Sequence, residues 1–139
     1  MISLVVWRIS LQLLRSTAVS TSSPTSVTLK GASRIDSIAM QYADGSTLVN
    51  GGTGGTAATL TLNSGEFITS AVVYKNSYKG SDRIFYLELT TNQNRKVAAG
   101  TKSGTSYTLS APSGSYVAGF LGRGGNNLDK LGLIFKILQ

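Results

Sequence analysis

An internal repeat is the feature that most constrains what this chain can fold into. When the sequence is shifted by 49 residues, so that Gly51 falls on Gly100, glycines and apolar residues match together without a gap. The matched pairs are Ile38 with Leu87, Met40 with Leu89, Gly51 with Gly100, Gly55 with Gly104, Thr59 with Thr108, Leu60 with Leu109, Gly65 with Gly114, Phe67 with Tyr116, and Ile68 with Val117. Turns need glycine where φ is positive, and paired strands keep the same inward face, so the pattern is typical of a repeated β unit.

A third copy of this unit begins near Asn126 and is incomplete. Leu131 and Leu133 stand where Leu87 and Leu89 stand in the second copy, 44 residues further along the chain. We expect the N-terminal strands to supply the missing half and to close a three-fold ring. Three small antiparallel sheets around one shared core are therefore predicted.

Strand-like runs recur at short intervals, and turn signals separate them. The runs are Leu4–Leu14, Val27–Lys30, Ile35–Tyr42, Thr59–Leu62, Phe67–Tyr74, Ile84–Thr90, Tyr107–Leu109, Tyr116–Leu121 and Leu131–Leu138. Convincing helical periodicity is absent, and 16 glycines with only 14% charged residues agree with short strands and tight turns. The sequence predicts one all-β domain over residues 1–139, in which residues 1–26 form an atypical N-terminal strand segment.

The chain contains no histidine and no cysteine, which removes the commonest general base, the commonest zinc ligand and every thiolate. The carboxylates are Asp36, Asp44, Glu66, Asp82, Glu88 and Asp129. A glycosidase would need two of them about 5–10 Å apart in a cleft. We therefore expect a protein that is not an enzyme and that uses no metal or other cofactor.

The net charge of +7 favours anionic partners such as sulfated glycan or acidic lipid. The cationic residues are spread singly, with only Arg95 and Lys96 adjacent, so a solvated basic surface is the simpler interpretation and no nucleic-acid partner is expected. No apolar run reaches the length of a membrane span. Arg8 interrupts the apolar segment Met1–Leu14, which we interpret as strand rather than signal peptide, and the compartment, secreted or cytoplasmic, stays open.

Five motifs add a second line of argument through their order and spacing. They are Gly31–Ile38 (GASRIDSI), Tyr42–Gly45 (YADG), Gly51–Gly55 (GGTGG), Asn63–Ile68 (NSGEFI) and Gly119–Gly132 (GFLGRGGNNLDKLG). Together they resemble the jacalin-related lectins, from about Val27 to the C-terminus. The resemblance implies a β-prism of three four-stranded antiparallel Greek-key sheets with pseudo-three-fold symmetry. It also implies binding of mannose- or galactose-type sugars without a metal.

A sugar site of this family pairs a Gly-Asp-x-x-Asp-like loop with a glycine-rich loop. An ionised carboxylate accepts strong hydrogen bonds from sugar hydroxyls, and glycine lets the backbone lie against the sugar. In the first repeat Asp36 occupies the second carboxylate position, while Ser33 replaces the first and Arg34 adds positive charge beside it. Gly51 and Gly52 supply the glycine half of this candidate site.

The second repeat departs further from the family pattern. Asp82 fills the first carboxylate position, but Phe85 replaces the second. Its glycine half is reduced to Gly100 and Gly104 around Lys102. We expect this site not to bind neutral sugar.

The third repeat supplies the other candidate site. Its members are Gly125, Asn126, Asn127, Leu128 and Asp129, with asparagine in place of the first aspartate. The family's partner glycines for this site lie near the N-terminus, where this chain has no glycine before Gly31.

Three functions follow from these features. The first is a lectin that binds mono- or oligosaccharides of cell-surface glycoconjugates through the Asp129 loop, through Asp36 with its glycines, or through both. The second keeps the fold but binds anionic glycan or lipid. The third is a β-prism retained for assembly, as the cell-targeting module of a larger, pore-forming toxin-like protein or as a homo-oligomer.

Overall fold

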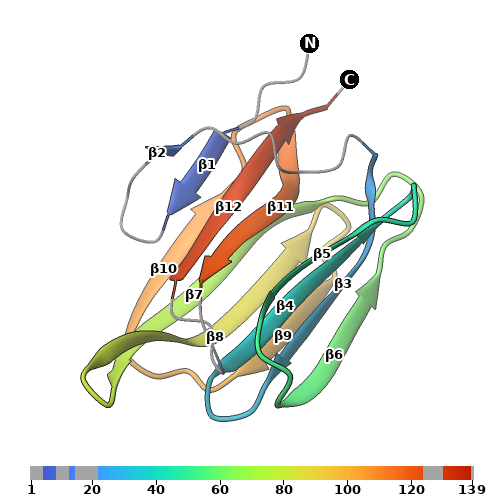
Figure 1. The fold of residues 1–139 in the computed structure, drawn as a ribbon. Coiled ribbons are helices and arrows are strands. Elements are labelled where there is room, and N and C mark those ends of the chain that lie inside the picture. The colour runs from blue at the N-terminus through green and yellow to red at the C-terminus, as the bar shows by residue number, and fades with distance from the viewer. Residues whose placement is uncertain (1–4, 9–12, 15–21, 124–129, 139) are drawn as a thin grey trace.

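The computed structural model describes residues 5–8, 13–14, 22–123 and 130–138, and these form strands and turns without a helix (Figure 1). The strands are β1 (Val5–Arg8), β2 (Leu13–Leu14), β3 (Pro24–Gly31), β4 (Ile35–Tyr42), β5 (Thr47–Gly51), β6 (Thr56–Thr61), β7 (Ile68–Tyr78), β8 (Ser81–Thr91), β9 (Lys96–Gly100), β10 (Thr105–Ser110), β11 (Ser115–Arg123) and β12 (Lys130–Ile137). The prediction of an all-β chain is confirmed.

Three four-stranded antiparallel sheets build the molecule, with strand orders β11-β12-β1-β2, β10-β7-β8-β9 and β5-β4-β3-β6. Figure 1 shows them as the faces of a prism around one interior. In the last two sheets a central hairpin continues into one edge strand, and the chain then crosses to the opposite edge. This is the expected Greek-key order, and the β-prism prediction is confirmed.

The sheet that contains the N-terminal strands has a different order from the one expected. Here β2 pairs with β1, through Val6–Leu14 and Trp7–Leu13, instead of crossing to pair with β11. In the other two sheets the crossing segment has a positive-φ glycine at each end, Gly51 and Gly55 or Gly100 and Gly104. The sequence between β1 and β2 contains no glycine, so it lacks the residues that let a crossing chain lie against a hairpin.

Strand boundaries differ from expectation mainly at the edges of the sheets. β5 and β9 were not expected, and the run Leu4–Leu14 contains two short strands, β1 and β2. β5 alternates between exposed and half-exposed residues, and β9 buries only Val97 fully. Edge strands of this kind contain few buried apolar residues, because backbone pairing with one neighbour holds them in place, so the sequence pattern does not reveal them.

The repeat is visible in matching backbone contacts. The amide of Gly52 donates to the carbonyl of Asp36 at 2.8 Å, and the amide of Thr101 donates to the carbonyl of Phe85 at 2.7 Å. Each donor follows a positive-φ glycine, Gly51 at 110° or Gly100 at 87°. The glycines matched in sequence therefore occupy the same structural position in two sheets.

One apolar core fills the prism, and each sheet contributes to it. Its fully buried large side chains are Leu29, Ile35, Ile38, Met40, Ile68, Ile84, Leu87, Leu89, Phe120, Leu131 and Leu133. The matched positions Ile38 with Leu87 and Met40 with Leu89 all belong to this set, as their periodicity predicted. Burial of these side chains is the main favourable term that holds the three sheets together.

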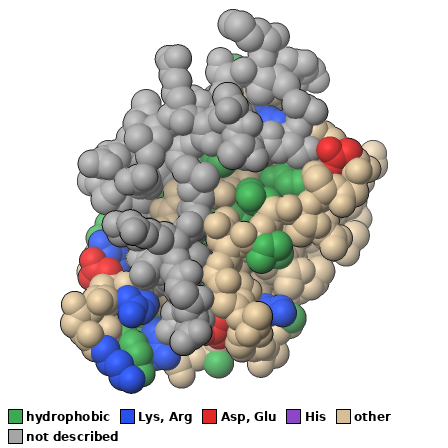
Figure 2. Space-filling model, viewed as in Figure 1, with side chains coloured by type: hydrophobic (Ala, Val, Ile, Leu, Met, Phe, Trp, Pro, Cys, Tyr) green, Lys and Arg blue, Asp and Glu red, His purple; other side chains and the backbone are tan. Residues whose placement is uncertain are grey.

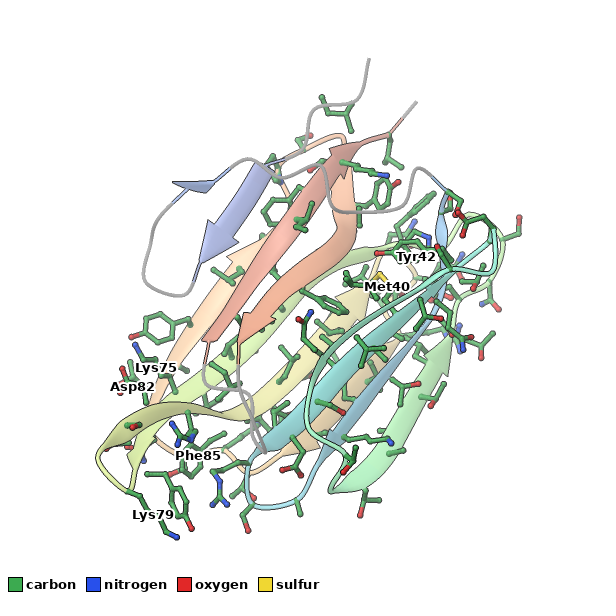
Figure 3. All side chains as sticks on the ribbon, viewed as in Figure 1. Met40, Tyr42, Lys75, Lys79, Asp82 and Phe85 are labelled. Carbon is green, nitrogen blue, oxygen red and sulfur yellow. The ribbon has the colours of Figure 1, made fainter. Side chains whose placement is uncertain are left out.

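Two polar contacts with buried oxygens link separate elements: the first joins two sheets, and the second ties the β6–β7 loop to the end of β8. The hydroxyl of Tyr42 on β4 donates to the carbonyl of Ala118 on β11 at 2.5 Å, and both residues are buried (Figure 3). The buried carboxylate of Glu66 accepts hydrogen bonds from the Asn63 amide, the Thr91 hydroxyl and the Arg95 guanidinium, at 2.8, 2.6 and 2.6 Å. Every buried oxygen named here therefore has a partner.

Candidate functional site

The candidate site of the first repeat lies at one end of the β5-β4-β3-β6 sheet. The turn between β3 and β4 and the loop between β5 and β6 meet there, because the Greek-key crossing carries the β5–β6 loop over the β3–β4 hairpin. Asp36 stands near the start of β4, and Gly51 pairs with Ser37 at the end of β5. The fold thus brings the two halves predicted from the sequence together.

Asp36 and the glycine loop are in direct contact. The Gly52 amide binds the Asp36 backbone carbonyl, which fixes the start of the loop on β4. The Asp36 carboxylate then faces the other end of the loop: a Cβ built on Gly54 would lie 3.9 Å from Oδ2, and one on Gly55 would lie closer than 3.0 Å. The carboxylate therefore sits against backbone that carries no side chain.

Steric limits explain why glycine is required at both ends of this loop. A Cβ on Gly51 would overlap the backbone of Asp36 and Ser37, and one on Gly55 would fall 2.7 Å from the amide nitrogen of Gly31. Both glycines also have positive φ, 110° and 88°. The loop is exposed over most of its length, and Asp36 beside it is half-buried.

Ser33 and Arg34 lie in the β3–β4 turn. Ser33 is exposed. The guanidinium of Arg34 lies 3.8 Å from the ring centroid of Tyr78 and 5.9 Å from that of Phe85. Arg34 therefore connects this site to the β7–β8 hairpin of the neighbouring sheet.

The second repeat has the same backbone but different chemistry. Phe85 occupies the position of Asp36, and Asp82 forms an ion pair with Lys75 at 3.2 Å (Figure 3). The Asn76 side-chain amide donates to the Ser103 hydroxyl at 2.9 Å, which fills part of the space beside Gly104. The atoms nearest to a Cβ built on Gly100 or Gly104 include no carboxylate oxygen. That this site does not bind neutral sugar stays a prediction.

The β7–β8 hairpin is longer than its counterpart, which the sequence reasoning missed. Leu29 pairs with Ile38 nine residues on, whereas Val73 pairs with Leu87 fourteen residues on, so this hairpin is five residues longer. Ile38 and Leu87 are 49 residues apart, whereas Leu87 and Leu131 are 44 residues apart. This difference of five residues between the copies could have revealed the extension. Arg34's contact with Tyr78 depends on that added length.

The third-repeat candidates Gly125, Asn126, Asn127, Leu128 and Asp129 lie outside the described residues. Among the residues that are described, no group of three or more histidine, cysteine, aspartate or glutamate side chains could hold a metal ion. No helix in the described part of the chain is long and apolar enough to span a membrane.

Comparison with known proteins gives consistent relatives. A mannose/glucose-specific lectin of Parkia pendula is 38% identical over 71 residues, which cover 51% of this chain and 16% of that lectin. Horcolin of Hordeum vulgare is 26% identical over 113 residues, which cover 77% of each protein. The structure of wild-type Malaysian banana lectin superimposes with a TM-score of 0.71 at 27% identity, covering 94% of this chain and 88% of that one.

Three four-stranded antiparallel sheets around one core define the class of β-prism domains. The jacalin-like lectin domain profile matches residues 12–134, and the chain belongs to that family. The chain spans only 16% of the Parkia lectin but 77% of horcolin.

Proposed function

We propose that this domain binds a neutral hexose at the surface formed by Asp36 and the Gly51–Gly55 loop, and that it acts by binding rather than by catalysis. The contact between the Asp36 carboxylate and the side-chain-free backbone of Gly54 and Gly55 is the observation that carries the proposal. Vicinal hydroxyls of a hexose donate to a carboxylate and accept from amide groups, so such a surface matches their chemistry.

Relatives support mannose- or glucose-type sugars as the first ligands to test. The Parkia lectin is named for mannose and glucose, and the part of this chain that matches it spans 71 residues. Ser33 supplies a hydroxyl where the family pattern has a carboxylate, so one charge-assisted hydrogen bond is replaced by a neutral one. We therefore expect modest affinity for a single sugar, raised when several sites bind one glycan surface.

The third-repeat loop is the alternative site of the same function. Asn126 and Asn127 offer amide donors and acceptors, and Asp129 offers a carboxylate. Its expected partner segment near the N-terminus has no glycine, which favours Asp36 as the main site. The two sites are separable by mutation because they use different residues.

Binding to a glycan array, with competition by free mannose or galactose, tests the function. Asp36→Ala removes an ionised acceptor, and we expect at least a tenfold loss of binding, since such hydrogen bonds contribute about 1.5–3 kcal/mol. Asp82→Ala is the matched control and should leave neutral-sugar binding unchanged. Loss with Asp129→Ala but not with Asp36→Ala would move the function to the third repeat, and unchanged binding in both would contradict the assignment.

A further inference from the structure

A cationic surface surrounds the tip of the β7–β8 hairpin. Figure 2 shows blue side chains gathered at the lower left, and Figure 3 places Lys75, Lys79 and Asp82 on that hairpin. We call the set the hairpin patch; its members are Arg34, Lys75, Lys79, Arg83 and Lys102, together with Tyr78, Tyr86 and Asp82. In residues 32–34, 75–83 and 101–104, which contain every member except Tyr86, positive side chains outnumber negative ones by five to one.

The hairpin patch is held in a defined shape. Lys79 and Gly80 form the tip and both have positive φ, 52° and 79°, which is typical of the tight turns that match strand twist. The Lys79 ammonium lies 5.3 Å from the Tyr78 ring centroid, and the Lys102 ammonium lies 5.4 Å from that of Tyr86. These cation–π contacts keep two lysines beside the hairpin without neutralising them.

Lys79 and Lys102 are the members best placed to meet a ligand. Both are exposed, and neither forms an ion pair within the described part of the chain. The Asp82 carboxylate, by contrast, pairs with Lys75. The patch therefore keeps a net positive charge at a solvent-facing tip, where anionic groups have access.

The patch lies next to the Asp36 site. Arg34 is two residues from Asp36 in sequence and reaches Tyr78 on the hairpin, and the Thr101 hydroxyl donates to the Ala32 carbonyl at 3.0 Å. The β9–β10 loop that carries Lys102 is thus fixed against the β3–β4 turn that borders the site. A glycan extending from a hexose at Asp36 toward this side would meet cationic side chains.

The details of the patch favour an acidic glycan over other anions. Single-stranded nucleic acid needs open aromatic faces for base stacking. Here Arg34 covers Tyr78, and Tyr74 packs edge-on against Tyr86 at 5.6 Å. Membrane insertion needs exposed apolar side chains, whereas the tip residues Lys79, Gly80 and Ser81 are polar or lack a side chain.

We propose that the hairpin patch binds the sulfate groups of sulfated glycans and so extends recognition beyond the neutral hexose. This inference rests on the proposed function for the position of the hexose at Asp36. The sulfate groups themselves are bound by residues of the hairpin patch, which the hexose site does not use. Sulfate groups on neighbouring sugars match separate, exposed ammonium groups that are spaced along a hairpin and a loop.

The test compares a heparin hexasaccharide with its chemically desulfated, still carboxylated counterpart, by calorimetry on the intact domain. The wild-type domain should bind the sulfated form more tightly, and raising the salt from about 50 to 200 mM should weaken that binding several-fold. The Lys79→Ala/Lys102→Ala double variant should lose about tenfold in affinity for the sulfated form. Lys96→Ala is the control: it removes one exposed cation from the far end of β9, where Lys96 pairs with Glu88 at 3.4 Å.

Equal affinity for sulfated and desulfated forms would overturn the proposal, as would a double variant that binds heparin as tightly as Lys96→Ala does. If the wild-type domain bound phosphatidylserine vesicles but not heparin, and the double variant lost the vesicle binding, the patch would be a membrane site and the proposal would be overturned as well.

Neutral-hexose binding should be unchanged in the double variant and lost in Asp36→Ala. If Asp36→Ala still binds the neutral hexose, the proposed hexose site is contradicted and the hairpin patch is not. If the double variant still binds heparin like wild type, only the role of the hairpin patch is contradicted. Thermal unfolding of each variant establishes that it is folded.

Discussion

The carboxylate of Asp36 and the α-carbon of Gly55 lie so close that no side chain fits between them, since a Cβ on Gly55 would come within 3.0 Å of Oδ2. Asp36 lies on a strand, whereas Gly55 ends the loop that crosses that strand's hairpin. This contact ties the chemistry of the candidate site to the Greek-key path of the chain. Changes at Asp36 should therefore affect ligand binding more than the fold, whereas changes at Gly55 should affect both.

Gly55→Ala tests that contact. We expect it to weaken sugar binding strongly and to destabilise the fold by more than the roughly 1–2 kcal/mol that positive φ alone costs a non-glycine residue, because the new methyl group meets Asp36 and Gly31. Gly45→Ala is the matched control, since Gly45 has nearly the same φ, 87°, but nothing within 4 Å of its Cβ position. If Gly55→Ala and Gly45→Ala lost the same free energy of unfolding and both still bound sugar, the close contact between Gly55 and Asp36 would be contradicted.

Tyr42→Phe tests the link between two sheets. Removing the hydroxyl leaves the buried Ala118 carbonyl without this donor, so we expect a loss of about 1–3 kcal/mol in the free energy of unfolding at neutral pH. Urea unfolding followed by tyrosine fluorescence measures it. Tyr107→Phe, at a half-buried position of the mostly exposed edge strand β10, should cost much less.

The same tyrosine predicts an alkaline transition. Burial raises the pKa of Tyr42 from 10.0 to about 12, with smaller contributions from Tyr116 and Asp44. Because the folded pKa is the higher one, this contribution to stability is complete below pH 10.0 and is lost as the pH rises toward 12. The stability difference between wild type and Tyr42→Phe should therefore shrink over that range, and a constant difference would contradict the assignment.

Glu66 predicts an acid-side dependence of the opposite sign. Burial alone would raise its pKa, but hydrogen bonds from Asn63, Thr91 and Arg95 and the charge of Arg95 hold the pKa below the ordinary value of 4.5. The stabilisation is therefore complete above 4.5 and is lost as the pH falls through the lower, folded pKa. Glu66→Gln should be less stable than wild type in urea unfolding at neutral pH, with a difference that closes in acid, and a difference that stays constant with pH would contradict the assignment.

The parts of the fold that the sequence predicted are those with local causes. Gly51 and Gly100 matched because each must adopt positive φ beside a hairpin, and Ile38 and Leu87 matched because each faces the core. The halves of the first candidate site followed from the resemblance of these motifs to the jacalin-related lectins. Such features depend on a few neighbouring residues, so a single sequence carries them.

The features that the sequence did not predict depend on distant partners. Nothing near Arg34 indicates that its guanidinium stacks on Tyr78, 44 residues away on another sheet. β5 and β9 are held by pairing with one neighbouring strand more than by their own apolar content. The use of Asp36 in binding likewise depends on a ligand and remains a proposal.

Amide chemical shifts during titration with methyl α-mannoside, in wild type and in Asp36→Asn, test the central claim most directly. The account predicts that the largest shifts fall on residues 51–55 and around Asp36, and that they vanish in Asp36→Asn while the rest of the spectrum keeps its folded dispersion. Methyl α-galactoside in a parallel titration covers the other sugar class. Shifts confined to residues 124–129, or shifts at residues 51–55 that persist unchanged in Asp36→Asn, would contradict it.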